Sequence, residues 1–366
     1  MEYVEHDLVK IAKRENNTKR NYLVVNPLQG KHIPVSPMAA CKLFSSLAEL
    51  LREEYAKENI LLIGFAETAT AIGAQAAVSL GVKYIQTTRE IIPGVDYLFF
   101  SEEHSHATEQ KLVKDDLDAA VPDLERIVFI EDEVTTGKTI LNIIQILEKR
   151  YPDRLRFSVA SLLNGMSEEH VQLYEQRGIK LHYLLKTDHR RYADIADQFA
   201  GDGNYYICDS INKREISVIT VPGRMDARRL VDAVQYEKAC EDLWNSVHGT
   251  IANVTQKRIL VIGTEEFMYP ALFVGKKLEE MGNAVWCHAT TRSPIAVSTE
   301  NGYPLHNRYE LKSLYDHERR TFIYDIGAYD CVLIVTDSPK EETIGLNTLV
   351  NALSVHNENI TLIRWC

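Results

Sequence analysis

The sequence predicts an α/β protein: a doubly wound parallel sheet, followed by a second α/β domain of Rossmann type. Short runs of branched apolar residues, such as Ile60–Ile63 and Ile127–Ile130, are typical of strands buried on both faces. Each run is followed by a polar turn and then by apolar residues at helical spacing. Strands that alternate with helices in this way form parallel sheets with helices on their faces.

The elements of the first half follow that alternation. In chain order we expect strands at 22–25, 60–63, 84–87, 97–100, 127–130, 156–163 and 181–185. We expect helices at 39–55, 69–80, 140–147 and 168–176. The stretch from 101 to 121 is polar and has no clear period, so it predicts a long loop.

A second unit is expected to begin near residue 216, which gives domains at 1–215 and 216–366. A chain of 366 residues has room for two domains of about 150 residues each. The expected elements are helices 230–247 and 270–281, with strands at 258–262, 284–288, 331–336 and 361–364. No internal repeat is evident.

Composition limits the classes of function. The net charge of −11 argues against general nucleic-acid binding, which depends on neutralising phosphates. No apolar stretch has the length that a bilayer requires, and the first residues do not resemble a signal peptide. The six cysteines lie far apart without a Cys-x-x-Cys pair, which favours free thiols and a cytoplasmic location.

The stretch 127–139, Ile-Val-Phe-Ile-Glu-Asp-Glu-Val-Thr-Thr-Gly-Lys-Thr, carries the most information. A buried strand leads into Glu131 and Asp132, and then into a turn that opens a helix. The free N–H groups of such a turn form an anion-binding nest, and ligands of open α/β sheets bind there. Glu131 and Asp132 suit the two hydroxyls of a ribose, or a divalent cation bound to it.

Two other interpretations compete for this stretch. Gly-Lys-Thr at 137–139 is similar to a nucleotide P-loop, but that motif needs a glycine where this chain has Asp132. The stretch is also compatible with an acidic helix start that binds nothing.

As a whole, the stretch resembles the signature of type I phosphoribosyltransferases, which bind phosphoribosyl pyrophosphate (PRPP). The resemblance implies that Mg²⁺ and the ribose hydroxyls of PRPP lie on Glu131 and Asp132. It also implies a 5-phosphate site on the turn that follows, formed by Val134, Thr135, Thr136, Gly137, Lys138 and Thr139.

Other segments match positions of the same family. The turn after strand 60–63 corresponds to the loop that grips pyrophosphate, with Glu67, Thr68, Ala69 and Thr70 as candidate contacts. Arg89 occupies the place of a basic pyrophosphate ligand. The mobile catalytic loop would contain Glu103, His104 and His106, with either histidine as general acid or base. For each of these segments, an ordinary capped helix, surface arginine or solvated loop is the alternative.

One departure bears on mechanism. Hypoxanthine-type enzymes have an aspartate three residues after the Glu-Asp pair, where this chain has Thr135, as orotate-type enzymes do. This difference puts a purine-salvage mechanism in doubt and moves the acid–base chemistry to residues 101–111.

Two further segments extend the resemblance over nearly the whole chain. Lys31 and His32 lie in Gly30–Pro37, where such enzymes place a hood over the acceptor base. Thr290-Thr-Arg-Ser-Pro294 contains the tetrapeptide that names the TRSP domain of two-domain phosphoribosyltransferases from tellurium-resistance and stress gene clusters. Candidate ligand contacts of this second domain are Thr264, Glu265, Thr291, Arg292 and Ser293. Ordinary loops that cap helices are the alternative here, as a structural turn is for Gly30–Pro37.

The resemblance implies transfer of a phosphoribosyl group from PRPP to a nitrogen nucleophile, on the way to a nucleoside-like metabolite. One alternative is a regulator of the same fold that senses PRPP without turnover, and another is an enzyme that runs the reaction backwards and phosphorolyses a nucleotide. We further expect a small-molecule acceptor, a homodimer, and partner enzymes of the same pathway.

Overall fold

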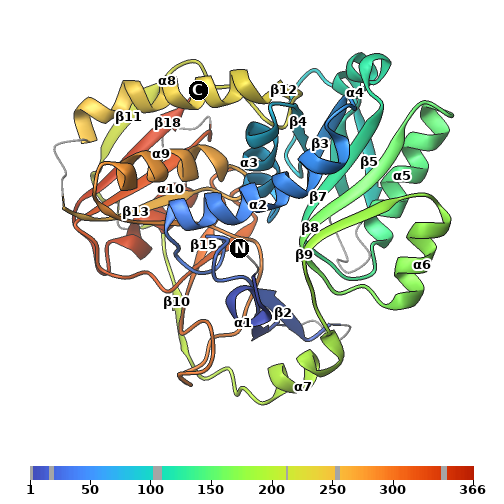
Figure 1. Cartoon of the computed structure of the whole chain (residues 1–366). Helices are drawn as coiled ribbons and strands as arrows, with labels where there is room; N and C mark the ends of the chain where they lie inside the picture. Colours follow the sequence, from blue (N-terminus) through green and yellow to red (C-terminus); the bar gives the residue numbers. More distant parts are fainter. Residues whose placement is uncertain (1–2, 16–19, 102–108, 212, 252–255, 339–343) are drawn as a thin grey trace. The chain divides into compact units, whose positions relative to one another are not determined.

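The chain is described from a computed structural model, which defines residues 3–15, 20–101, 109–211, 213–251, 256–338 and 344–366. Packing divides it into two compact units (Figure 1). The first unit contains Met1–Tyr3, Lys42–Asp188 and Met225–Lys238. The second unit contains Val4–Cys41, His189–Arg224 and Ala239–Cys366.

The first unit is built on a six-stranded sheet in the order β12-β4-β3-β7-β8-β9, in which only β12 is antiparallel to its neighbour. The strands are β3 (Ile60–Gly64), β4 (Lys83–Gln86), β7 (Arg126–Val134), β8 (Arg156–Asn164), β9 (Lys180–Lys186) and β12 (Val231–Asp232). The helices are α3 (Thr70–Leu80), α4 (Lys114–Ala120), α5 (Lys138–Arg150) and α6 (Glu168–Gln176), and β5 (Tyr97–Ser101) pairs with β6 (Glu109–Val113).

The second unit contains a five-stranded, fully parallel sheet in the order β11-β18-β17-β13-β14. Its strands are β11 (Ser217–Val221), β13 (Arg258–Gly263), β14 (Ala284–Ala289), β17 (Cys331–Thr336) and β18 (Ile360–Trp365), with helices α9 (Tyr269–Glu280) and α10 (Ile344–Leu353). Smaller sheets join β10 (Asn204–Ile207) to β15 (Asn307–Lys312) and β16 (Arg320–Tyr324), and β1 (Lys10–Lys13) to β2 (Tyr22–Val25). Short helices are α1 (Glu5–Leu8) and α7 (Tyr192–Asp197).

Two long helices cross from one unit to the other along the chain. Helix α2 (Pro37–Tyr55) begins in the second unit and ends in the first, whereas α8 (Ala233–Ile251) begins in the first and ends in the second. None of the described helices has the length and apolar character that a bilayer crossing requires.

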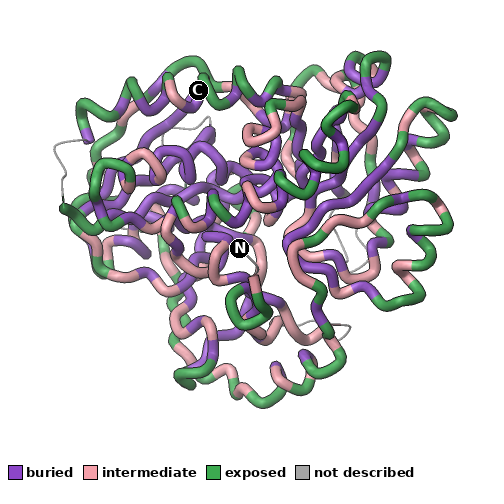
Figure 2. The backbone as a smooth tube through the Cα atoms, viewed as in Figure 1, coloured by how far each residue is buried: buried purple, intermediate pink, exposed green. Residues whose placement is uncertain are grey.

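Apolar burial explains why these strands and helices form. Every residue of β3, β17 and β18 is buried, as Figure 2 shows for the central strands of both parallel sheets. In β7 the apolar residues are buried, while Glu131, Asp132 and Glu133 are half-buried where the strand leaves the core. Helix α5 buries the face formed by Ile140, Ile143, Ile144 and Leu147. These patterns confirm the predicted α/β fold with a doubly wound first sheet.

The packing units do not coincide with the predicted halves. Residues 4–41 and 189–215 pack with the C-terminal half, because their backbones pair with it; for example, Val35 and Cys287 exchange two hydrogen bonds of 3.0 and 2.7 Å. The two units describe packing and do not show where one evolutionary domain ends and the next begins, so the domain boundary near residue 216 stays a prediction.

Candidate active site

The order of strands in the first unit marks a candidate ligand site. The chain runs from β3 through α3 outward to β4, and then returns to the other side of β3 as β7. It continues outward in the opposite direction to β8 and β9. The carboxyl ends of β3 and β7 therefore flank a topological switch point, which is where open α/β sheets bind ligands.

At the end of β7, Gly137 shapes the turn into α5. Its φ of 71° lies in the left-handed region, and an added Cβ would lie 2.3 Å from the hydroxyl oxygen of Tyr174. That hydroxyl donates a hydrogen bond of 2.6 Å to the Gly137 carbonyl, which also accepts the N–H of Leu141 at 3.0 Å. The carbonyl is thus held toward the helix, whose first N–H groups have no acceptor from a preceding turn of helix and are of the kind that binds anions.

The turn after β3 meets the acids of β7. The hydroxyl of Thr68 donates a hydrogen bond of 2.9 Å to the carboxylate of Asp132. The side chain of Glu67 in the same turn is buried, and the peptide bond between Ala66 and Glu67 is cis. The structure therefore brings together two segments that the sequence singled out separately.

Hydrogen bonds between side chains and backbone groups hold this turn in place. The N–H of Ala66 donates to the hydroxyl of Thr87 at 2.8 Å, and the Ala66 carbonyl accepts the amide nitrogen of Gln110 at 2.6 Å. Thr70 is buried and donates to the carbonyl of Glu67 at 3.3 Å, so it closes the turn. Gln110 lies in the stretch that the sequence predicted as loop.

Arg89 follows β4 and is half-buried. Its carbonyl accepts the ammonium of Lys111 at 3.0 Å. The neighbouring Thr88 exchanges backbone hydrogen bonds with Lys111 at 2.8 and 2.9 Å, which fixes the direction in which the chain leaves the sheet.

The remaining predicted contacts of the turn 134–139 differ in accessibility. Val134 and Gly137 are buried, Thr135, Thr136 and Thr139 are half-buried, and Lys138 is exposed. Ala69, the N-cap residue of α3, is fully buried. Glu103, His104 and His106 lie outside the described residues.

The residues at the end of β7 suit a cation that arrives with a phosphorylated ligand. Neighbouring strand residues point to opposite faces, so Asp132 points away from Glu131 and Glu133. Across the described parts of the chain, no group of three or more histidine, cysteine or acidic side chains could hold a metal. Magnesium is commonly bound by one or two carboxylates together with substrate phosphates. Asp132 or Glu131 could supply the carboxylate.

Lys31 and His32 belong to the second unit. The ammonium of Lys31 is fully buried and donates hydrogen bonds of 2.9 Å to the carbonyls of Glu265 and Thr290. His32 is 3% exposed, and its ring packs edge-on against Tyr324. These contacts give both residues a structural role in the second unit, and their predicted role near the acceptor base stays a prediction.

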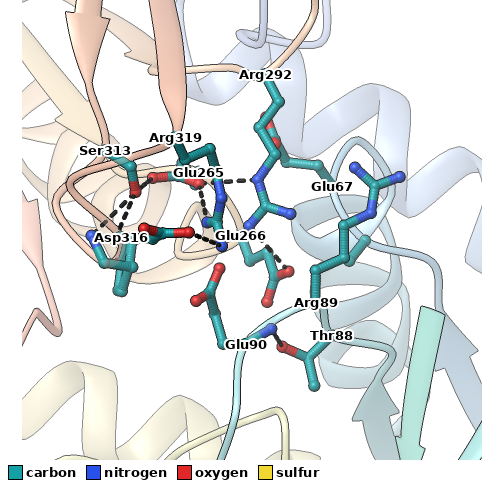
Figure 3. Close-up of polar contacts among 12 residues, drawn as sticks. Glu67, Thr88, Arg89, Glu90, Glu265, Glu266, Arg292, Ser313, Asp316 and Arg319 are labelled. Atoms are coloured by element: carbon teal, nitrogen blue, oxygen red, sulfur yellow. Dashed lines mark hydrogen bonds and ion pairs between the residues drawn. The ribbon is translucent and has the colours of Figure 1, made fainter. Parts of the chain in front are cut away.

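Two of the second-unit candidates, Glu265 and Arg292, meet at one buried carboxylate (Figure 3). Glu265 is 1% exposed, and one of its oxygens accepts Arg292 and Arg319, each at 2.8 Å. The other oxygen accepts the hydroxyl of Ser313 at 2.5 Å. Glu266 lies 3.5 Å from Arg292. The predicted pair Glu265 and Arg292 is thus in direct contact.

The other second-unit candidates contact protein partners; Thr264 and Thr291 are buried, and Ser293 is half-buried. Thr264 shares its hydroxyl with those of Tyr315 at 2.7 Å and Thr336 at 2.9 Å. Thr291 is 1% exposed and pairs through its backbone with β16, while the Ser293 carbonyl accepts the hydroxyl of Tyr324 at 2.6 Å.

Sequence reasoning missed several residues of both sites. Tyr174, Gln110, Ser313 and Arg319 contact candidate residues or their loops, and Asp337 accepts the hydroxyl of Tyr315, which also contacts Thr264. Asp337 had a usable signal, because it directly follows a buried strand as Asp132 does. The other four come from helices or hairpins distant in sequence, and no local pattern marks them.

Comparison with known proteins identifies the family. A phosphoribosyl transferase model matches residues 8–187, and a model of the TRSP domain that lies C-terminal to it matches residues 227–353. A search of curated proteins finds no match.

Solved structures resemble about half of the chain. Adenine phosphoribosyltransferase from Rhodothermus marinus is 14% identical, with 50% of this chain and 96% of that chain covered and a TM-score of 0.36. The enzyme from Giardia lamblia, complexed with 9-deazaadenine, is 18% identical with the same coverage and TM-score. Orotate phosphoribosyltransferase from Aeropyrum pernix is 16% identical, with 49% and 85% covered and a TM-score of 0.31.

The two family models together span most of the chain, in the order that the TRSP model describes. The chain is therefore a phosphoribosyltransferase of the family that carries a C-terminal TRSP domain.

Proposed function

We propose that the protein transfers the 5-phosphoribosyl group of magnesium-bound PRPP to a nitrogen nucleophile and releases pyrophosphate. The hydrogen bond of 2.9 Å between Thr68 and Asp132 carries this proposal. It joins the turn expected to bind pyrophosphate to the acid expected to bind ribose, at the switch point of the sheet.

Each part of PRPP has proposed contacts in the first unit. The 5-phosphate lies on the turn 134–139, whose backbone Gly137 shapes. The ribose hydroxyls lie on Glu131 and Asp132. Pyrophosphate lies on the turn 67–70 and on Arg89. Magnesium enters as part of the substrate and neutralises charge on the leaving pyrophosphate.

The reaction balances without a further reactant. The nitrogen lone pair of the acceptor forms a bond to C1 of the ribose, and the bond from C1 to the pyrophosphate oxygen breaks. Positive charge builds up on the ribose ring during this exchange, and nearby carboxylates stabilise it. The proton lost by the acceptor nitrogen passes to a base, for which His104, His106 and Glu103 are the proposed candidates.

The acceptor is proposed to resemble a nucleobase, and the product to be the precursor of a nucleoside-like metabolite. Family membership and Thr135, which replaces a catalytic aspartate of hypoxanthine-type enzymes, support this proposal over purine salvage. Incubation of labelled PRPP with metabolite extracts, followed by mass spectrometry, identifies the acceptor through the mass it adds to phosphoribose.

Calorimetry with Mg-PRPP tests the donor site. We expect Asp132→Asn to weaken binding by about ten- to a hundredfold, because it removes a charged acceptor worth about 1.5–3 kcal/mol. Glu148→Gln is the matched control: it makes the same change on the exposed side of α5 and should leave binding unchanged.

Absence of Mg-PRPP binding, or equal binding by the wild type and Asp132→Asn, would refute the donor assignment. Pyrophosphate release across a panel of nucleobases then separates an enzyme from a sensor. Tight PRPP binding without release for any acceptor or extract would identify a regulatory protein.

A further inference from the structure

The second unit repeats the topology of the first. In the first unit the chain runs β3, α3, β4, returns past β3 to β7, and continues through α5 to β8. In the second unit it runs β13, α9, β14, returns past β13 to β17, and continues through α10 to β18. An antiparallel hairpin interrupts the return in both units: β5 with β6, and β15 with β16.

The registers of the two sheets agree. Gly64 at the end of β3 pairs with Gln86 and Ile130, and Gly263 at the end of β13 pairs with Ala289 and Val335. Asp132 lies two residues after Ile130, and Asp337 lies two residues after Val335. These registers make Asp337 the counterpart of Asp132.

The loops beyond the strands make the same bonds. The Gly64 carbonyl accepts the N–H of Thr87 at 2.9 Å, and the Gly263 carbonyl accepts that of Thr290 at 3.1 Å. The hydroxyl of Thr87 accepts the N–H of Ala66 at 2.8 Å, and that of Thr290 accepts the N–H of Glu265 at 3.0 Å.

The hairpins are attached in the same way. Thr88 forms an isolated antiparallel bridge with Lys111 of β6, and Thr291 forms one with Phe322 of β16. In both units this bridge joins the residue after the bonded threonine to the second strand of the hairpin.

Residue identities follow these structural matches. Five of eight residues are identical between Ile60–Glu67 and Ile259–Glu266, and both second strands are followed by Thr-Thr-Arg. The arginines are Arg89 and Arg292. The repeat is hidden in the sequence because 23 residues separate Gly64 from Thr87, whereas 27 separate Gly263 from Thr290.

Even the edge pairing is repeated. Val231 pairs antiparallel with Tyr84 of β4, and Val35 pairs antiparallel with Cys287 of β14. Tyr84 and Cys287 each lie three residues before the bonded threonine. Each edge residue leads into a helix of 19 residues, α8 or α2.

The units differ just before the turn that is proposed to bind the leaving group in the first unit. The counterpart of Ala66 is Glu265, whose carboxylate binds Arg292, the counterpart of Arg89 (Figure 3). Ser313 and Arg319 bind the same carboxylate from the loop between β15 and β16. In the second unit, a side-chain carboxylate of the protein itself thus lies where these groups would bind a free anion.

We infer that the second unit is a second copy of the phosphoribosyltransferase core, and that its pyrophosphate-class anion pocket is occupied by the carboxylate of Glu265. A free anion would have to displace that carboxylate and leave it buried without its arginines, which is strongly unfavourable. The chain therefore carries one PRPP site, in the first unit. The location of that site rests on the proposed function, whereas the occupation of the second pocket by Glu265 does not.

Inorganic pyrophosphate binding to the full chain tests the filled pocket by calorimetry. Glu265→Ala removes the internal anion and should bind one equivalent of pyrophosphate more than the wild type does. The additional site should bind pyrophosphate at least about tenfold more tightly than any second site of the wild type. Adding Arg319→Ala should abolish the gain. Glu318→Ala removes a carboxylate from the same loop at an exposed position and should produce no gain.

The gain is counted relative to the wild type, so it does not depend on whether the first unit binds PRPP. If Glu265→Ala unfolds easily, millimolar pyrophosphate should raise its melting temperature more than that of the wild type. A folded Glu265→Ala protein without the extra site would overturn the inference. Two PRPP equivalents on the wild type, one of them lost in Arg292→Lys, would overturn it without any Glu265 variant.

Discussion

At the scale of single residues, Gly137 controls the shape of the proposed 5-phosphate turn. It combines a left-handed backbone with a close contact to the buried Tyr174, whose hydroxyl holds the Gly137 carbonyl. Burial raises the pKa of the Tyr174 hydroxyl, so it stays protonated and keeps donating this bond. The turn is therefore set before any ligand arrives.

Replacement of Gly137 by alanine should destabilise the protein by about 2 kcal/mol or more. The left-handed conformation alone costs about 1–2 kcal/mol with a Cβ, and the contact with Tyr174 adds to that cost. Gly178→Ala is a matched control, because Gly178 has a φ of 68° but nothing within 4 Å of an added Cβ. Chemical denaturation measures both; equal losses would show that the Tyr174 contact has no effect.

At the scale of elements, β14 carries a charge-sensitive residue inside the second unit. His288 is 2% exposed, and its ring shares a hydrogen bond of 2.8 Å with the Tyr324 carbonyl. Burial lowers the pKa of His288 to about 4, and the nearby ammonium of Lys31 acts in the same direction. The strand therefore packs with a neutral imidazole.

Stability should depend on pH through this histidine. The unfolded chain binds its proton near the ordinary pKa of about 6.5, whereas the folded chain binds it near 4, so stability is lost as pH falls through that window. The loss is on the order of 3 kcal/mol. His288→Asn should flatten the wild-type slope between pH 6.5 and 4 in urea denaturation, while the exposed His317→Asn should not. An unchanged slope in His288→Asn would contradict the burial of a neutral ring.

The parallel strands and their helices were predictable because each carries its own periodic signal. Ile60–Ile63 and Ile127–Ile130 are buried strands as expected, and helix Glu168–Gln176 has the predicted ends. The strand expected at 97–100 is confirmed as β5 (Tyr97–Ser101), but β6 (Glu109–Val113) and α4 (Lys114–Ala120) were missed, because they lie in the polar stretch that was wrongly expected to be a loop. Its polar residues carry no alternation, and the pairing that stabilises it comes from partners elsewhere in the chain.

At the scale of the whole molecule, the candidate sites were predictable only in part. Residues that follow buried strands, such as Asp132 and Arg292, could be found because strand ends gather at one edge of a parallel sheet. Their partners Thr68 and Glu265 were also candidates, but the contacts between them depend on the strand order. That order, and the repeat of the first unit in the second, emerge only from long-range pairing.

The exchanged edges predict that the two sequence halves do not fold alone. Fragment 1–215 lacks Val231, which covers β4, and fragment 216–366 lacks Val35, which covers β14. An uncovered sheet edge favours aggregation. Size-exclusion chromatography should find each fragment aggregated when expressed singly, and a complex of the two when they are expressed together. A monomeric, cooperatively unfolding 1–215 fragment would contradict this expectation.

The same pairings set the order of events during synthesis. Val231, which pairs with Tyr84, is synthesised 147 residues after it, and Cys287, which pairs with Val35, is synthesised 252 residues after it. Contacts between residues so far apart form slowly, because the loop-closure entropy must be overcome first. Neither sheet can therefore complete its edge until most of the chain has been translated, and an unpaired strand edge is prone to aggregation during that interval.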